Sequence, residues 1–148
     1  MTRINLVPVE ELYDQHLFAE YREIKMVPKS LARSLKAAEK HPDVARRFLT
    51  PIGVVLEKVP KMFTLNTGHV SFFYDKGAYL RERYAELCAE LDHRNVNYDK
   101  TSKFDPDGVM LHHSFDRGYV PTPEALAIVR ARIAEKIAMK PDWYRYTG

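Results

Sequence analysis

The sequence is poor in cysteine and in long apolar runs, and each shortage excludes a class of protein. Its 148 residues include one cysteine, Cys88, so an internal disulfide is excluded and a cysteine-rich metal cluster has no ligands. No apolar run approaches the roughly 20 residues that a membrane helix needs. The opening stretch carries Arg3 and then acids from Glu10, which is not the pattern of a signal peptide. We therefore expect a cytoplasmic protein with no membrane partner.

Several catalytic signatures are also missing. The chain has no glycine-rich loop that could cradle a phosphate, no nucleophile elbow and no dinucleotide fingerprint. His112 and His113 are adjacent, which is the wrong spacing for two ligands on one helical face, and the other histidines are scattered. The sequence therefore predicts neither a metal site nor a cofactor.

Composition is that of one globular domain over residues 1–148, with 45% hydrophobic and 29% charged residues. The net charge is +3, and it is uneven: residues 1–50 and 122–148 each carry +2, whereas 51–121 carry −1. Two mildly basic ends permit a nucleic-acid surface. Ordinary solvated charge would give the same distribution, so this observation does not decide between the two.

Apolar spacing predicts an all-α fold. Three main helices are expected, over residues 8–25, about 72–92 and 123–139. Pro28 should interrupt or kink the chain before helical spacing resumes over 29–49. Residues 50–67 and 93–121 are expected to be loops, the second with a short helix at 109–113. No strand pattern is present, so the fold class is all-α with long connections.

The first 23 residues hold a candidate reactive pair. If Met1 is removed, Thr2 carries a free α-amine with an ordinary pKa of about 8, against about 10.4 for lysine. Such an amine is partly neutral at pH 7 and could attack a sugar carbon. Glu23 stands near the end of the first helix, and a chain folded back from Pro8 is long enough for Thr2 to reach it. The alternative is a disordered terminus and an acid that pairs with Arg3 or Arg22.

Other candidates lie on the first and last helices. His16 shares the helical arc of Glu23, where it could contact a phosphate or a base, or could simply be a half-buried histidine. Arg132 and Lys136 are four residues apart and share a face. With Arg22 they could hold phosphates, or they could form an ordinary solvated surface.

The tail ends in Trp143, Tyr144, Arg145 and Tyr146. These aromatic rings could stack on bases. Alternatively, they could cap the helices with apolar area, which fits Trp143 better than it fits the two tyrosines.

These segments together resemble the pyrimidine-dimer DNA glycosylases of the phage endonuclease V type. The matching stretches are MTRINL at the start, DQHLFAEYRE at 14–23, GHVSFFYDK at 68–76, ARIAEKIAMKP at 131–141 and WYRY at 143–146. The match is poor over residues 28–60 and 93–120, where this chain is longer. The resemblance implies an all-α domain with its N terminus threaded between helices, acting on damaged double-stranded DNA.

The resemblance also implies roles for individual residues. The Thr2 α-amine would attack C1′ at the 5′ pyrimidine of a cyclobutane dimer, cut the base–sugar bond and form an imine with the opened sugar, after which β-elimination breaks the strand. Glu23 would stabilise the cationic sugar and assist the elimination. Residues implied in DNA binding are Arg3, His16, Arg22, Arg132, Lys136, Tyr144 and Tyr146.

One position departs from the family pattern. Met26 stands one turn after Arg22, where the family has a basic residue. This departure leaves open the same chemistry on another lesion, such as ring-opened purines, and a non-catalytic DNA-binding module also remains an alternative. A monomer is expected, because a lesion has no two-fold symmetry for a dimer to match.

Overall fold

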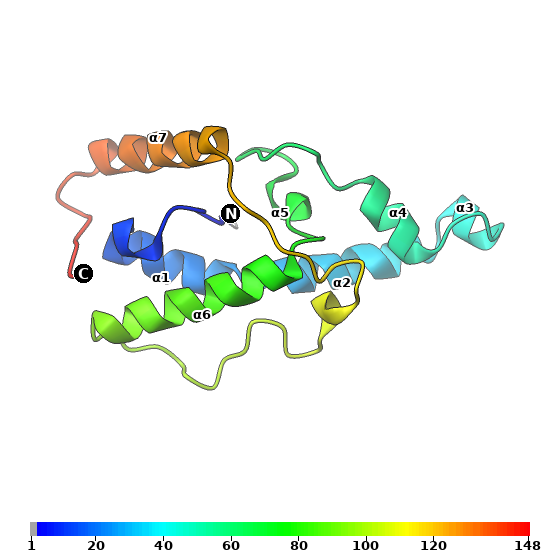
Figure 1. Cartoon of the computed structure of the whole chain (residues 1–148), viewed down its shortest axis with the longest axis horizontal. Coiled ribbons are helices and arrows are strands. Elements are labelled where there is room, and N and C mark those ends of the chain that lie inside the picture. Colours follow the sequence, from blue (N-terminus) through cyan, green and yellow to red (C-terminus); the bar gives the residue numbers. More distant parts are fainter. Residues whose placement is uncertain (1–2) are drawn as a thin grey trace.

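The computed structural model describes residues 3–148, and its elements are helices joined by turns and loops (Figure 1). The longer helices are α1 Asp14–Glu23, α2 Met26–Ala38, α6 Gly77–His93 and α7 Pro123–Met139. The shorter elements are η1 Val9–Glu11, α3 Pro42–Ala45, α4 Pro51–Glu57, α5 His69–Phe72 and η2 Val109–Leu111. No strand occurs among the described residues, so the prediction of an all-α fold is confirmed.

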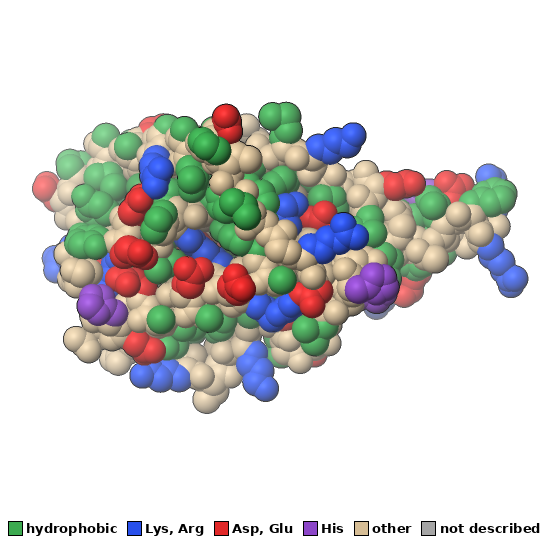
Figure 2. Space-filling model, viewed as in Figure 1, with side chains coloured by type: hydrophobic (Ala, Val, Ile, Leu, Met, Phe, Trp, Pro, Cys, Tyr) green, Lys and Arg blue, Asp and Glu red, His purple; other side chains and the backbone are tan. Residues whose placement is uncertain are grey.

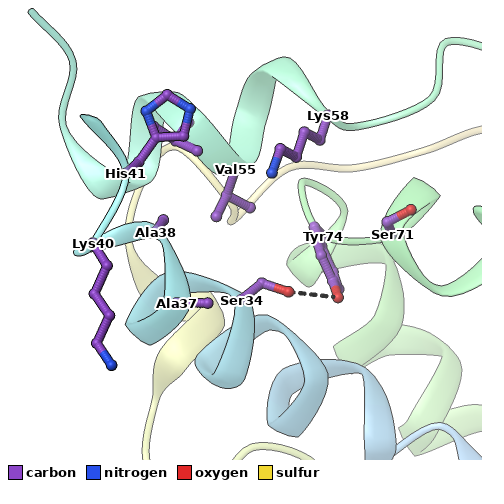
Figure 3. A pocket seen from close by; sticks show the side chains of 10 residues that line it. Ser34, Ala37, Ala38, Lys40, His41, Val55, Lys58, Ser71 and Tyr74 are labelled. Carbon is purple, nitrogen blue, oxygen red and sulfur yellow. Dashed lines mark hydrogen bonds between the residues drawn. The ribbon is translucent and has the colours of Figure 1, made fainter. Parts of the chain in front are cut away.

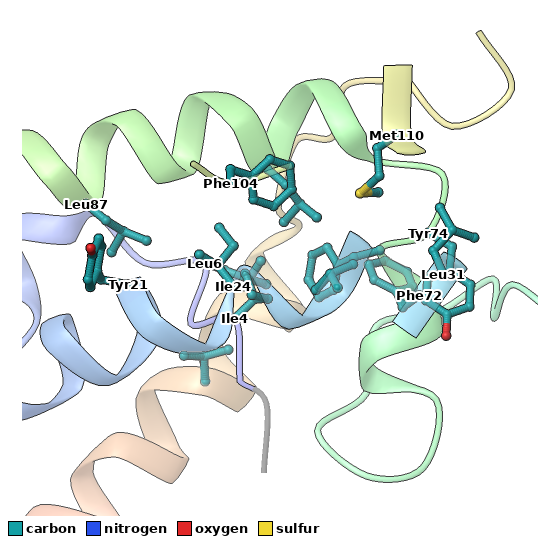
Figure 4. Packing of buried hydrophobic residues seen from close by; sticks show 14 of the residues in the cluster. Ile4, Leu6, Tyr21, Ile24, Leu31, Phe72, Tyr74, Leu87, Phe104 and Met110 are labelled. Carbon is teal, nitrogen blue, oxygen red and sulfur yellow. The ribbon is translucent and has the colours of Figure 1, made fainter. Parts of the chain in front are cut away.

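The helices surround one apolar core. In Figure 1, α6 runs beside α1, α2 continues in the same direction beyond α1, and α7 lies on the other side of the N-terminal segment. Figure 4 shows Ile4 and Ile24 side by side in this core, with Leu87 of α6 on one side and Met110 of η2 on the other. None of the described helices is long and apolar enough to cross a membrane.

The N-terminal segment is part of this core rather than an extension at the surface. Residues 4–7 are all buried, with Ile4 fully inaccessible to solvent. The segment passes between α1 and α7 in Figure 1. For the described residues of this segment, the expectation that the N-terminal end is threaded between helices is therefore confirmed.

The first expected helix, over residues 8–25, is shorter than predicted. The chain makes the 3-10 turn η1, runs extended through Leu12 and Tyr13, and only then enters α1. The buried Arg94 side chain explains the break, because its guanidinium donates to the carbonyl oxygens of Leu12, at 2.6 Å, and of Val9, at 3.4 Å. The Leu12 carbonyl is therefore taken by a tertiary contact, and the Val9 carbonyl is shared between Arg94 and the Leu12 N–H of the 3-10 turn.

Pro28 interrupts the helix as predicted, but the interruption lies four residues before Pro28, at Ile24. Pro28 lies in the first turn of α2 and has no N–H to donate to Ile24, so the regular ladder stops at Ile24 and Lys25. The Val27 N–H bonds to the Ile24 carbonyl at 3.2 Å in a tighter turn. The chain therefore passes from α1 to α2 at a kink and not through a long loop.

The prediction of a loop over residues 50–67 is wrong in its first part. Residues 51–57 form α4, whose start is fixed by the Thr50 hydroxyl accepting from the Gly53 N–H at 3.0 Å and by Pro51 in the first turn. The same arrangement was correctly predicted at α7, where Thr122 accepts from the Ala125 N–H at 3.1 Å.

The middle helix is divided into α5 and α6, and Gly77 marks the division. Its N–H donates to the Phe115 carbonyl at 2.7 Å. A Cβ at this position would lie 2.9 Å from the Met110 carbonyl oxygen and 3.0 Å from that of Phe115. Glycine is thus required here by the close approach of the loop backbone.

Gly77→Ala should therefore destabilise the protein by roughly 1–3 kcal/mol, the usual cost of forcing an extra group into packed backbone. Gly118→Ala is the matched control, since nothing lies within 4 Å of a Cβ placed there. Denaturant unfolding of both variants checks this. Equal stabilities would show that the loop moves away from α6 at no cost.

Candidate active site

A polar pocket lies where α1, α7, the N-terminal segment and the tail converge. Its volume is about 290 Å³. The residues that line it are Arg3, Asn5, His16, Ala19, Glu20, Glu23, Arg132, Ile133, Lys136 and Tyr144. Six of the predicted site residues therefore meet in one cavity, although they come from both ends of the chain.

Glu23 and Arg3 face each other across the inner wall. Burial raises the pKa of the Glu23 carboxyl above its ordinary value, while Arg22, a backbone hydrogen bond from Arg3 and the charge of Arg3 pull it down. The Arg3 guanidinium donates to the Leu65 carbonyl at 3.0 Å. Burial and the nearby Arg132 lower the pKa of Arg3, against the opposing effect of Glu23. The pocket thus holds a carboxyl group of raised proton affinity beside fixed positive charge.

His16 and Tyr144 form a flat aromatic wall. Their rings stack with centroids 4.6 Å apart and planes 13° from parallel. Burial lowers the pKa of His16, and the positive charge of Lys136 lowers it further, so the imidazole is neutral at pH 7. Its Nδ1 atom is buried and has no hydrogen-bond partner within residues 3–148. The wall therefore combines stacked rings with one buried polar atom that has no hydrogen bond among the described residues.

Arg132 and Lys136 stand one turn apart on α7 and form the basic rim of the pocket. The contact between Arg132 and Glu135 is long, at 3.9 Å, and lies near the surface, so it neutralises little of the charge. With Arg3, these residues make the pocket positive, which is what a phosphate-bearing substrate requires.

A buried ion pair fixes the segment that leads into the pocket. Glu20 is fully buried and Arg83 is 3% exposed. The Arg83 guanidinium donates to both carboxylate oxygens of Glu20, at 2.6 and 3.0 Å, and to the Val7 carbonyl at 2.5 Å. Burial alone would lower the pKa of Arg83, but the Glu20 carboxylate outweighs it and raises that pKa. Glu20 also accepts from the Asn5 N–H at 3.0 Å, so the pair holds the N-terminal backbone at two points.

His69 holds the same segment one residue earlier. Its Nε2 accepts from the Ile4 N–H at 2.8 Å, and its Nδ1 lies 2.7 Å from the Thr64 carbonyl. These two contacts define the tautomer, because Nδ1 must carry the proton that it donates to Thr64. Burial lowers the pKa of His69, which keeps the ring neutral and able to accept.

Of the other three predicted site residues, Thr2 lies outside the described residues, and two do not line this pocket. Arg22 faces a neighbouring groove, with its guanidinium 5.7 Å from the Phe18 ring centroid. The Tyr146 hydroxyl donates to the Glu10 carbonyl at 2.6 Å, and its ring lies 4.7 Å from the Arg94 guanidinium. The capping alternative thus describes Tyr146, whereas Tyr144 lines the pocket.

A second cavity of about 400 Å³ lies between α2, α4 and α5. Figure 3 shows Ser34 and Tyr74 hydrogen-bonded in it, with Lys58 and His41 at its edge. Its lining includes no carboxylate that could serve in catalysis. Within residues 3–148 there is also no group of three His, Cys, Asp or Glu side chains that could hold a metal ion. The pocket at Glu23 is therefore the candidate active site.

A comparison with protein families gives one match. The family model described as pyrimidine dimer DNA glycosylase matches residues 1–104. The match includes Arg3, His16 and Glu23, while α7 and the tail, which supply the basic rim and Tyr144, follow it in the chain.

Glu20→Ala should destabilise the fold by about 3–5 kcal/mol, because it leaves the Arg83 charge buried without its partner. Glu11→Ala is the control, since Glu11 pairs with Arg130 at the surface and should contribute at most about 1 kcal/mol. Urea unfolding measures both. A small effect of Glu20→Ala would mean that water or another group replaces the lost carboxylate.

Proposed function

Since the chain belongs to the pyrimidine dimer DNA glycosylase family, we propose that it cuts the base–sugar bond of the 5′ pyrimidine at cyclobutane dimers through the α-amine of Thr2. With Met1 removed, this amine attacks C1′ of the damaged nucleotide, and the bond from C1′ to the base breaks. The sugar ring then opens to an imine on Thr2. Loss of a proton from C2′ expels the 3′ phosphate, and water finally releases the sugar.

The observation that carries this proposal is the tie between Glu23 and Arg3. The Glu23 carboxyl accepts a hydrogen bond from the backbone of Arg3, the residue joined to Thr2. Consecutive α-carbons are about 3.8 Å apart, so the amine of a chain starting at Thr2 belongs within a few ångströms of Arg3. The contacts of Ile4 and Asn5 to His69 and Glu20 fix the direction of this segment.

The other pocket groups fit the demands of the reaction. A carboxylate beside C1′ stabilises the positive charge that develops on the sugar. Arg132 and Lys136 on the basic rim suit the flanking phosphates, and Arg3 adds positive charge to the same pocket. The stacked rings of His16 and Tyr144 offer a flat surface for a base removed from the duplex stack.

Borohydride should trap a covalent adduct between the protein and a duplex containing a cyclobutane dimer, because it reduces the imine to a stable amine. Mass spectrometry of the digested adduct should place the sugar on a peptide that starts at Thr2. Protein that retains Met1 is the control and should yield little adduct. An adduct on a lysine would contradict the proposal, and no adduct with any lesion would favour a binding module without catalysis.

Glu23→Gln should abolish base release while binding to dimer-containing DNA persists. Because burial raises the pKa of Glu23 in the folded protein, its charge costs stability above that pKa, and the neutral amide should not lower Tm at pH 7. In the unmodified enzyme, activity should fall as the pH drops through this raised pKa. Base release that survives in Glu23→Gln at any pH would remove Glu23 from the mechanism.

A further inference from the structure

The segment from α2 to α4, residues 26–58, forms an arm that extends away from the candidate active site. Figure 1 shows α3 and the adjoining ends of α2 and α4 projecting at one end of the molecule. Helix α4 packs back along α2, with Val54 and Val55 buried. The arm is therefore the packed helices α2 and α4, with residues 39–50, which include the short helix α3, at its tip.

The arm carries the positive charge of the protein. It has seven Lys or Arg residues against three acids, a net charge of +4, whereas the whole chain has +3. The remaining residues together carry −1. All seven basic side chains of the arm are exposed: Lys29, Arg33, Lys36, Lys40, Arg46, Arg47 and Lys58.

These charges are not neutralised within the part of the chain that the structure describes. The salt bridges among residues 3–148 use cations outside the arm, such as Arg83, Arg94 and Arg130. None of the seven arm cations lies within 4 Å of a carboxylate oxygen there. An ordinary solvated face alternates the two signs of charge, and this surface does not.

Along α2 the cations are aligned. At 100° per residue, Lys29, Arg33 and Lys36 fall within about 60° of one another, and Lys40 just beyond the helix end continues the line. The stripe is about 16 Å long, which corresponds to about five base pairs of a duplex. It starts six residues after Glu23, in the first turns of α2 and so at the end of that helix nearer to the pocket.

The tip of the arm has a different character. Arg46, Arg47 and Phe48 are exposed in succession, with Phe48 74% accessible. Arg47 has a positive φ of 63°, an uncommon conformation for a residue with a side chain. The Phe48 N–H bonds to the Asp43 carbonyl at 2.8 Å, which fixes the turn. Figure 2 shows the projection as narrow, with Lys and Arg side chains at its far end.

We propose that this arm is a second contact surface for duplex DNA, used beside the lesion. The α2 stripe lies along the phosphates of undamaged duplex, and the tip enters a groove, where Arg side chains are attracted and an apolar ring can lodge against base steps. The inference rests on the proposed function, which supplies duplex DNA as the binding partner. It adds that the binding site extends well beyond the damaged nucleotides and is electrostatic in origin.

The double variant Arg33→Gln, Lys36→Gln tests the stripe. Its control is Lys103→Gln, Arg117→Gln, which removes two exposed cations outside the arm. Affinity is measured across salt concentrations for a long dimer-containing duplex and for a short one that covers only the lesion. For the long duplex, the arm variant should reduce the slope of log K against log salt by about 1.8, since each lost phosphate contact is worth about 0.9. Affinity for the short duplex should not change.

Phe48→Ala tests the tip. It should weaken binding of the long duplex several-fold without altering the salt slope, because no charge is removed. Since Phe48 is exposed, Tm should stay as it was, which excludes unfolding as the cause. An unchanged affinity for the long duplex would overturn insertion of the tip.

Two results would overturn the role of the stripe: equal losses in the arm and control variants, which would indicate net charge alone, or no loss in either. Borohydride trapping on the short duplex separates this inference from the proposed chemistry. If trapping on the short duplex persists and the arm variants bind the long duplex as well as the unmodified protein does, only the role of the arm is refuted. Absence of trapping in the unmodified protein refutes the chemistry, whatever the arm does.

Discussion

The structure depends on the buried ion pair between Glu20 and Arg83. Two charges removed from water are costly unless every lone pair and proton finds a partner, and here the Asn5 N–H and the Val7 carbonyl complete the set. The pair therefore has all its hydrogen-bond partners only when the N-terminal segment is in place against α1 and α6. Apolar side chains of similar volume could fill the space, but they would not determine the direction of the backbone at residues 5–7. The ion pair thus fixes the position of the backbone at residues 5–7.

Two glutamates less than one turn apart on α1 serve different ends because their surroundings differ. Glu20 makes charge-assisted bonds to Arg83 and to a backbone N–H, and so it is committed to the structure. Glu23 is only half-buried, lies in the pocket wall, and has its pKa raised by burial more than its neighbours lower it. A carboxyl that holds protons more strongly than usual beside an open cavity is suited to chemistry. Glu20, which is held in its ion pair, thus supports the helix turn that carries Glu23, whose buried charge costs stability.

Sequence reasoning succeeded where a local signal decided the structure. The Thr122-Pro123 start of α7 and the Pro28 kink needed no tertiary information, and the same signal at Thr50-Pro51 could have revealed α4. Sequence reasoning failed where a residue far away in the chain decided the local structure. Arg94, some eighty positions away, breaks the expected first helix at Leu12, and no spacing pattern reveals this. The structural role of Glu20 in the buried ion pair could not be predicted either. An acid on an amphipathic helix is normally solvated, and its partner Arg83 belongs to α6. The pocket residues were predicted from both chain ends by resemblance, whereas their meeting is a property of the fold.

Net charge conceals how this protein can meet a polyanion. A total of +3 in 148 residues is a weak signal, yet the charges are unevenly placed. Among the described residues, seven cations of the body form ion pairs with carboxylates, whereas none of the seven arm cations does. A rigid pocket must hold its phosphates at fixed distances, so its few cations contribute geometry. An exposed stripe on a helix pair contributes attraction that does not depend on sequence, because it reads the backbone of the duplex and not its bases. A protein that must find rare damage in a large excess of intact DNA needs both, and separating them lets the pocket remain selective while the arm supplies affinity.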